Sequence, residues 1–531
     1  MDIEALLASA QRDEVLVRAA LALQQGELNA AEVLLRARLL DQPTDVPAIR
    51  MMAELAARLG RYSDAEKLLD RALDLAPGFH SARANLVTVL HRQSKFVRAR
   101  AEADRLIAAE PHNLGHLALR AAVMVRTGDY EEAIAAYSTV LGKFPDQPGL
   151  WISLGHVLKT VGRQDGSIAA YRMAIYQQPT LGDAWWSLAN LKTVEINDAD
   201  VAAMTQALAS AAEIADRYHL HFALGKAFED RAQWEASFNH YAQGNRLRRE
   251  ERPYDPDRMT AHVKRSRALF DSATLTRRGG HPSNAPIFVV GLPRAGSTLI
   301  EQILASHCQV EGTMELPDIG TIANDLGGRG SHGGDYLSAL LALSSDERCA
   351  LGQRYLDGTR IQRKTDRPRF VDKMPNNFAH AGLIHLILPN AIIIDARRHP
   401  MANGFSAYKQ HFSRGQGFTY DLADLGRYWC DYAELMAHFD DVLPGRIYRV
   451  AHEQLVNDSE GQIRALLDHA GLPFEDACLR PHETRRPVRT ASSEQVRQAI
   501  SAEALDHWRH YAQWLGPLQT ALGNAVENYS I

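Results

Sequence analysis

The chain has 531 residues, of which 46% are hydrophobic and 23% are charged, and its formal net charge at pH 7 is -5. This composition excludes a fibrous or globally disordered protein, and the length predicts at least two domains. The small negative charge argues against a nucleic-acid binder that works through bulk positive charge. It leaves room for a local basic pocket that binds a small anion.

The cysteines and the N-terminal sequence indicate a reducing compartment. The four cysteines lie far apart and form no CxxC pair, so we expect neither a zinc knuckle nor a disulfide framework. Residues 1–20 contain early acids and no apolar core of a signal peptide, and no run of about 18 apolar residues occurs. We therefore expect a cytoplasmic chain that needs no metal and has neither membrane nor nucleic acid as a partner.

A 34-residue period marks the N-terminal part of the chain. Prolines recur with this step, and so does a turn position that holds glycine in four repeats and serine in one. This period, with a glycine between two helices and a proline after the second, matches the tetratricopeptide repeat. An irregular helical bundle would need five prolines in register by chance. The positions are Pro43, Pro77, Pro111, Pro145 and Pro179 for the prolines, and Gly26, Gly60, Ser94, Gly128 and Gly162 for the turns.

After the repeats, residues 217–251 read as one further helix pair that caps the solenoid, and a charged connector follows. From Pro286 the pattern changes to short apolar runs that alternate with helical stretches, which predicts a parallel sheet covered on both faces. The fold class is thus an α-helical solenoid followed by an α/β, P-loop-like domain. The expected domains are 1–250 and 285–531, with the connector at 251–284. The expected strands lie at 286–292, 369–372, 391–397 and 446–450.

The loop that follows the first expected strand carries phosphate-binding chemistry. Gly291 and Gly296 have the spacing of the Walker A loop, but Ser297 stands where its lysine should be. Backbone amides and a helix N-terminus can still hold one phosphate. Without the lysine, the loop suits a 5'-phosphate that carries a sulfuryl group better than a triphosphate.

The segment PIFVVGLPRAGSTLIEQIL (286–304) resembles the 5'-phosphosulfate loop of sulfotransferases, especially the tyrosylprotein sulfotransferase branch and bacterial repeat-fused relatives. The resemblance implies 3'-phosphoadenosine 5'-phosphosulfate (PAPS) as the donor. It also implies that the loop residues contact the donor's 5' end. These residues are Arg294, Ala295, Gly296, Ser297 and Thr298.

The resemblance extends to the other end of the donor. In sulfotransferases an arginine after a central strand and a serine eight positions later hold the 3'-phosphate, and Arg398 and Ser406 have this spacing. Residues 489–508 resemble the family segment that folds over the nucleotide, with Ser492 matching its functional serine and Arg497 a further expected donor contact. Two positions depart from the family: Ala499 replaces a proline, and His452 replaces a tyrosine near the adenosine.

Catalysis requires a base for the acceptor hydroxyl and a cation for the leaving oxygen. The resemblance implies Glu315 as the base, with Lys373, Arg294 and Ser492 supporting the transition state. Glu311 competes with Glu315, since Met314 stands at one of the family's acidic positions. His307 is a rival base, but we interpret it as a packing residue at a helix end.

The sequence thus predicts a sulfotransferase that acts on a hydroxyl acceptor, with protein tyrosine as one candidate, and repeats that recruit a protein or peptide. The glycine-rich stretch 327–334 is expected near the acceptor, although a plain surface loop fits it almost as well. A P-loop nucleotide kinase or NTPase is an alternative that the missing lysine disfavours. A non-catalytic repeat scaffold is another, disfavoured by the intact site residues. The acceptor and the oligomeric state stay open, a homo-oligomer included.

Overall fold

The computed structural model describes residues 10–276, 279–328, 336–413, 415–502 and 505–529. The chain forms two compact units, Met1–Pro145 and Asp146–Ile531. The expected domain limits at 250 and 284 stay a prediction about domains, because the second compact unit includes the later repeats together with the sheet. The glycine-rich stretch expected near an acceptor falls largely at 329–335, outside the described residues.

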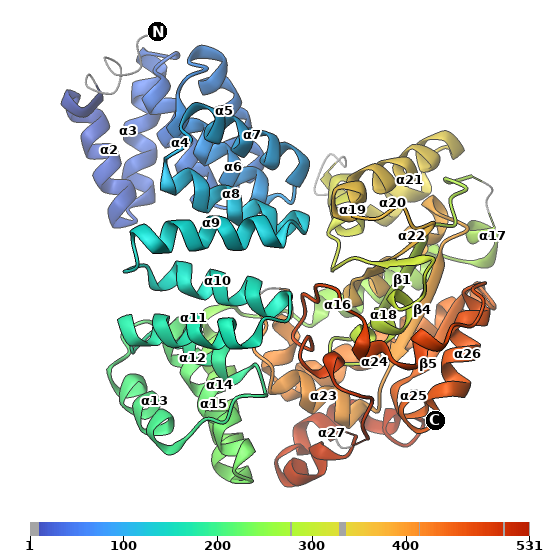
Figure 1. Cartoon of the computed structure of the whole chain (residues 1–531). Helices are drawn as coiled ribbons and strands as arrows, with labels where there is room; N and C mark the ends of the chain where they lie inside the picture. The colour runs from blue at the N-terminus through green and yellow to red at the C-terminus, as the bar shows by residue number, and fades with distance from the viewer. Residues whose placement is uncertain (1–9, 277–278, 329–335, 414, 503–504, 530–531) are drawn as a thin grey trace. The chain divides into compact units, whose positions relative to one another are not determined.

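The first unit is a stack of paired helices, as the 34-residue period predicts (Figure 1). Each expected proline lies two residues after the second helix of its pair. Gly26, Gly60 and Gly128 form the turns with positive φ, and Ser94 adopts the same conformation with φ of 60°. The helices are α2 (Glu14–Gln25), α3 (Leu28–Asp41), α4 (Val46–Arg58), α5 (Tyr62–Leu75), α6 (His80–Arg92), α7 (Phe96–Ala109), α8 (Leu114–Thr127) and α9 (Tyr130–Lys143).

Small residues explain how the paired helices approach one another. Ala31, Ala65, Ala99 and Ala133 recur with the period of the repeat, and each is fully buried. A small side chain at this position lets two helix backbones pack closely, and larger residues around it fill the core. The repeat is therefore encoded in its buried face as well as in its turns.

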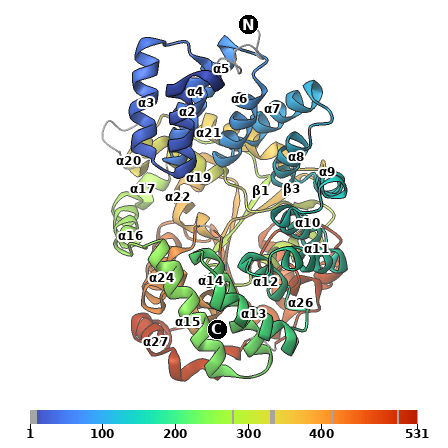
Figure 2. The same cartoon turned by 90° about the vertical axis from the view of Figure 1, so that its left-hand side faces the viewer.

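The second unit begins with more helices of the same kind, and Figure 2 shows them in green near the viewer. The helix pair expected at 217–251 is present, with its turn at Ala232. The charged connector contains two helices, α16 (Asp257–Leu269) and α17 (Ser272–Leu275). The earlier helices are α10 (Pro148–Thr160), α11 (Gln164–Gln177), α12 (Gly182–Ala189), α13 (Asp198–Ser210), α14 (Ile214–Asp230) and α15 (Trp234–Glu251).

A five-stranded parallel sheet follows, with the order β2-β3-β1-β4-β5. The four expected strands are all present, and β2 was not expected because its three residues are too short to show a pattern. The strands are β1 (Pro286–Gly291), β2 (Val310–Gly312), β3 (Arg369–Lys373), β4 (Ile392–Arg397) and β5 (Ile447–Ala451).

Helices cover both faces of this sheet. Apolar residues of α18 and α26 pack on one face, against Val289 and Ile394, and aromatic residues of α21 and α24 pack on the other. The chain leaves the central β1 for the edge of the sheet and returns, so a crevice is expected beyond the carboxyl end of β1. The helices are α18 (Ser297–Ala305), α19 (Asp318–Gly328), α20 (Tyr336–Leu341), α21 (Ser345–Thr359), α22 (Ala381–Ile387), α23 (Pro400–Tyr408), α24 (Leu422–Val442), α25 (His452–Asn457), α26 (Ser459–His469) and α27 (Gly516–Leu522).

Within the described ranges, no helix is both long enough and apolar enough to span a lipid bilayer.

Candidate active site

The loop between β1 and α18 has a backbone that only certain residues tolerate. Gly291 and Gly296 have φ of 135° and 94°, and Arg294 has φ of 69°. A Cβ at Gly291 would lie 2.4 Å from the Ala396 carbonyl oxygen, and one at Gly296 would lie 2.7 Å from His452 Nδ1. The loop therefore packs tightly against its neighbours, and it leads directly into the N-terminus of α18, which favours an anion.

Arg294 connects the loop to two distant segments. Its Nε donates a hydrogen bond to Ser406 Oγ at 3.1 Å, and one terminal nitrogen donates to Gln495 Oε1 at 2.9 Å. The other terminal nitrogen donates to Ser492 Oγ. Residues expected at the 5' and 3' ends of one donor thus meet around a single guanidinium.

These residues border one cavity of about 390 Å³. Five cationic side chains and a single carboxylate line it among the described residues. Burial and the neighbouring arginines lower the pKa of His452 to about 3, and burial and nearby lysines lower the pKa of His507 to about 4, so both rings are neutral at pH 7. The lining of the cavity therefore holds more basic than acidic side chains. The cations are Lys192, Lys226, Arg294, Arg398 and Lys409, and the carboxylate is Glu229.

Two of the cations lie against each other. Arg398 is 8% exposed and donates to the Arg294 carbonyl oxygen at 3.5 Å. Burial and the proximity of Arg398 lower the pKa of Arg294 to about 10. Two buried guanidinium groups this close repel each other, and a bound dianion would relieve the repulsion.

The expected catalytic pair lies at the same edge of the sheet. Lys373 Nζ donates to Glu315 Oε1 at 2.6 Å, and the side chains are 1% and 45% exposed. Lys373 ends β3 and pairs in register with Val289 of β1. The loop between β1 and α18, called the phosphate-type loop below, begins shortly after Val289. Neither Lys373 nor Glu315 is among the residues that line the cavity.

The carboxylate of Glu311 is held by hydrogen bonds from a neighbouring loop. Its carboxylate accepts the backbone N–H of Thr365 at 3.1 and 3.2 Å and the Thr365 hydroxyl at 2.8 Å, and it also accepts the backbone N–H of Lys364. Glu311 is 7% exposed, whereas Glu315 is accessible. Of the two candidate bases, Glu315 is the one that an acceptor can reach.

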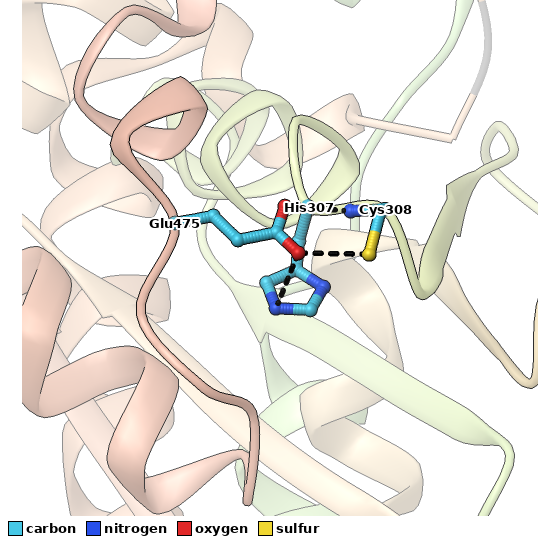
Figure 3. A group of neighbouring side chains, drawn as sticks. All are labelled: His307, Cys308 and Glu475. Atoms are coloured by element: carbon cyan, nitrogen blue, oxygen red, sulfur yellow. Dashed lines mark hydrogen bonds and ion pairs between the residues drawn. The ribbon is translucent and has the colours of Figure 1, made fainter.

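His307 forms a small cluster with Cys308 and Glu475 (Figure 3). Its Nδ1 accepts the backbone N–H of Gln309 at 3.1 Å, so the proton lies on Nε2, which contacts the Pro473 carbonyl oxygen at 2.9 Å. The ring is fully buried. These contacts fit the packing role expected for His307.

The C-terminal segment contacts the loop and α18. Arg486 pairs with buried Glu301 of α18 at 2.9 Å, and Thr298 donates to Thr490 at 3.3 Å. Ser492, His452 and Ala499 line the cavity.

Arg497 lies elsewhere. Its Nη2 donates to the Thr160 carbonyl oxygen at 3.0 Å, so in this structure it contacts the solenoid helix α10, and it is not among the cavity-lining residues. The expected donor contact of Arg497 is therefore placed differently, because the guanidinium satisfies a helix C-terminus.

Four charged residues of the cavity were not predicted from the sequence. Lys192, Lys226 and Glu229 come from the end of the solenoid, and Lys409 lies one helical turn after Ser406. No spacing in the sequence marks them, because packing between distant helices brings them together.

The comparisons with known proteins agree with this architecture. Residues 286–476 match the sulfotransferase family. Residues 8–149 match the tetratricopeptide domain of cytochrome c-type biogenesis protein H, and residues 120–181 match the tetratricopeptide repeat. The chain is therefore a tetratricopeptide-containing protein with a sulfotransferase-family domain.

Two relatives share parts of the chain. An uncharacterised protein of Aquifex aeolicus is 36% identical over 306 residues, which are 56% of this chain and 40% of that protein. Cellulose synthase operon protein C of Pseudomonas fluorescens is 32% identical over 161 residues, which are 28% of this chain and 12% of that protein. The chain thus spans less than half the length of either relative.

Solved structures resemble each part separately. The sulfotransferase domain of a Synechococcus olefin synthase is 21% identical, with a TM-score of 0.34, and the match covers 44% of this chain and 90% of that one. A tetratricopeptide repeat protein of Parabacteroides merdae is 15% identical, with a TM-score of 0.36, and the match covers 46% and 93%.

Proposed function

We propose that the chain transfers a sulfuryl group from PAPS to a hydroxyl acceptor. The observation that carries the proposal is the charge of the cavity, whose five cations face one carboxylate. PAPS carries roughly four negative charges at pH 7, divided between its 3' and 5' ends. The cavity would match this distribution, with Arg398 and Ser406 holding the 3'-phosphate and the loop 294–298 holding the phosphosulfate.

The proposed transfer reaction relies on the pair formed by Glu315 and Lys373. Glu315 would take the proton of the acceptor hydroxyl as the acceptor oxygen attacks sulfur. The bond from sulfur to the bridging oxygen breaks, and Lys373 and Arg294 would stabilise the negative charge on adenosine 3',5'-bisphosphate as it leaves. The exposure of Glu315 supports this role, since an acceptor must reach the base.

The acceptor would be a hydroxyl of a protein or peptide, with tyrosine as the first candidate. The repeats support this proposal, because tetratricopeptide arrays present extended surfaces suited to protein partners. Sugar and small-molecule hydroxyls need the same base, so an acceptor screen must include them.

Glu315→Gln tests the proposal. With radiolabelled PAPS and fractionated lysate as acceptor, we expect transfer to fall by roughly 100- to 10,000-fold, the usual contribution of a general base, while adenosine 3',5'-bisphosphate still binds. Glu311→Gln is the matched control, expected to lower thermal stability and to leave transfer by the folded protein largely intact. Full transfer by the Glu315 variant would remove Glu315 from the role.

A further inference from the structure

The end of the solenoid contributes to the wall of the cavity. Lys192 follows α12 and lines the same space as Arg294 and Ser492. Its Nζ donates to the Ala491 carbonyl oxygen at 3.4 Å, directly beside Ser492, whose hydroxyl accepts from Arg294. The ammonium therefore lies on the side of the cavity formed by the phosphate-type loop.

The surroundings of Lys192 contain cations and no matching acid. Among the described residues it forms no ion pair, and burial, followed by the charge of Arg294, lowers its pKa well below the usual value. Arg294 itself bonds to neutral partners. By contrast, Lys409 is neutralised by Glu229 at 2.9 and 3.0 Å, and Lys226 pairs with Asp230. Lys192 is thus a half-buried amine with no acid paired to it, and a bound anion would favour its charged form.

The backbone of Lys192 also departs from what a lysine prefers. Its φ is 63°, in the left-handed region that costs a non-glycine residue about 1 kcal/mol or more. Glycine would fit this position with less strain, so a lysine here calls for a reason outside the helix turn.

The same part of the solenoid holds the segment that carries Ser492. The Thr160 carbonyl oxygen at the end of α10 accepts the backbone N–H of Val488 at 2.9 Å and a nitrogen of Arg497 at 3.0 Å. From the other side, Arg486 anchors the segment to α18. Helix α10 and helix α18 together therefore hold the segment that carries Ser492 next to the loop.

From these contacts we infer that Lys192 binds the 5'-phosphosulfate of the donor, so that the last repeats complete the donor site in addition to any role in recruiting partners. This inference rests on the proposed function. It adds a binding residue from outside the sulfotransferase-family segment 286–476.

Calorimetric titration of the full chain with two nucleotides tests the assignment. Adenosine 3',5'-bisphosphate has the 5' charge, and adenosine 3'-monophosphate lacks it. For Lys192→Met we expect roughly 10- to 100-fold weaker binding of the bisphosphate, the effect of one charge-assisted hydrogen bond, and little change for the monophosphate. Arg398→Met should weaken both.

Two further variants control for folding and for charge. Lys192→Gly removes the ammonium while relieving the backbone strain, so it should reproduce the selective loss in a protein that melts no lower than the wild type. Lys264→Met removes an exposed lysine that does not line the cavity and should bind both nucleotides normally.

The outcomes separate the inference from the function on which it rests. If the wild type binds the bisphosphate and the Lys192 variants bind both nucleotides as the wild type does, or lose both equally, the role of Lys192 at the 5' end is refuted and the proposed function stands. If the wild type binds neither nucleotide, both fail.

Discussion

Ser94 shows how far a repeat constrains one residue. It occupies the turn position that glycine holds in the neighbouring repeats, and the chain accepts φ of 60° there. Since a left-handed conformation disfavours residues with a Cβ, this repeat is less stable than it could be.

Ser94→Gly should therefore stabilise the first unit by about 0.5–1 kcal/mol, because relief of strain exceeds the added flexibility of the unfolded chain. The midpoint of urea unfolding measures the change. Ser138→Gly is the matched control, since Ser138 is exposed in the interior of α9 and should lose about the same amount. A lower midpoint for Ser94→Gly would contradict the account.

An ion pair joins Glu229 of α14 to Lys409, the residue that follows α23. Glu229 is 8% exposed and accepts from Lys409 and from the Tyr241 hydroxyl at 3.1 Å. Burial alone would raise the pKa of Glu229, but the ammonium of Lys409 prevails and lowers it to about 2. The carboxylate is thus ionised at neutral pH, and its loss would leave a buried ammonium without a counter-charge.

Glu229→Gln should lower the free energy of unfolding by about 3 kcal/mol, the usual effect of removing one partner from a buried pair. Glu229→Gln combined with Lys409→Met should recover most of this loss, because no buried charge is then unpaired. Chemical denaturation of the single and double variants measures the loss of unfolding free energy and its recovery. A double variant as unstable as the sum of the two single ones would show that the pair is not coupled.

The elements that the sequence predicted are those with a regular pattern. The repeat helices follow the buried alanines at Ala31, Ala65 and Ala99, and four strands follow apolar runs. Strand β2 has too few residues to show a period. Helix α16 lies in a charged stretch of sequence and packs against α24.

The residues of the candidate site likewise fall into those that the sequence predicted and those that it did not. Residues in local motifs, such as Gly296 and the pair Arg398 and Ser406, were predicted and lie around one cavity. Lys192 and Glu229 were not, because only the packing of the solenoid against the sheet domain brings them there. Arg497 was expected to contact the donor, and in this structure its guanidinium contacts the end of α10.

The second compact unit, Asp146–Ile531, contains the end of the solenoid together with the sheet. Helices α10 to α15 supply contacts to the C-terminal segment and side chains to the cavity.

The most direct test of the account is whether the cavity prefers a nucleotide with a 3'-phosphate over a triphosphate. We predict that adenosine 3',5'-bisphosphate binds the full chain and raises its melting temperature, and that a tenfold excess of ATP does not displace it, since Ser297 replaces the lysine that a triphosphate needs. Tighter binding of ATP than of the bisphosphate would contradict the sulfotransferase assignment and favour a nucleotide kinase or NTPase.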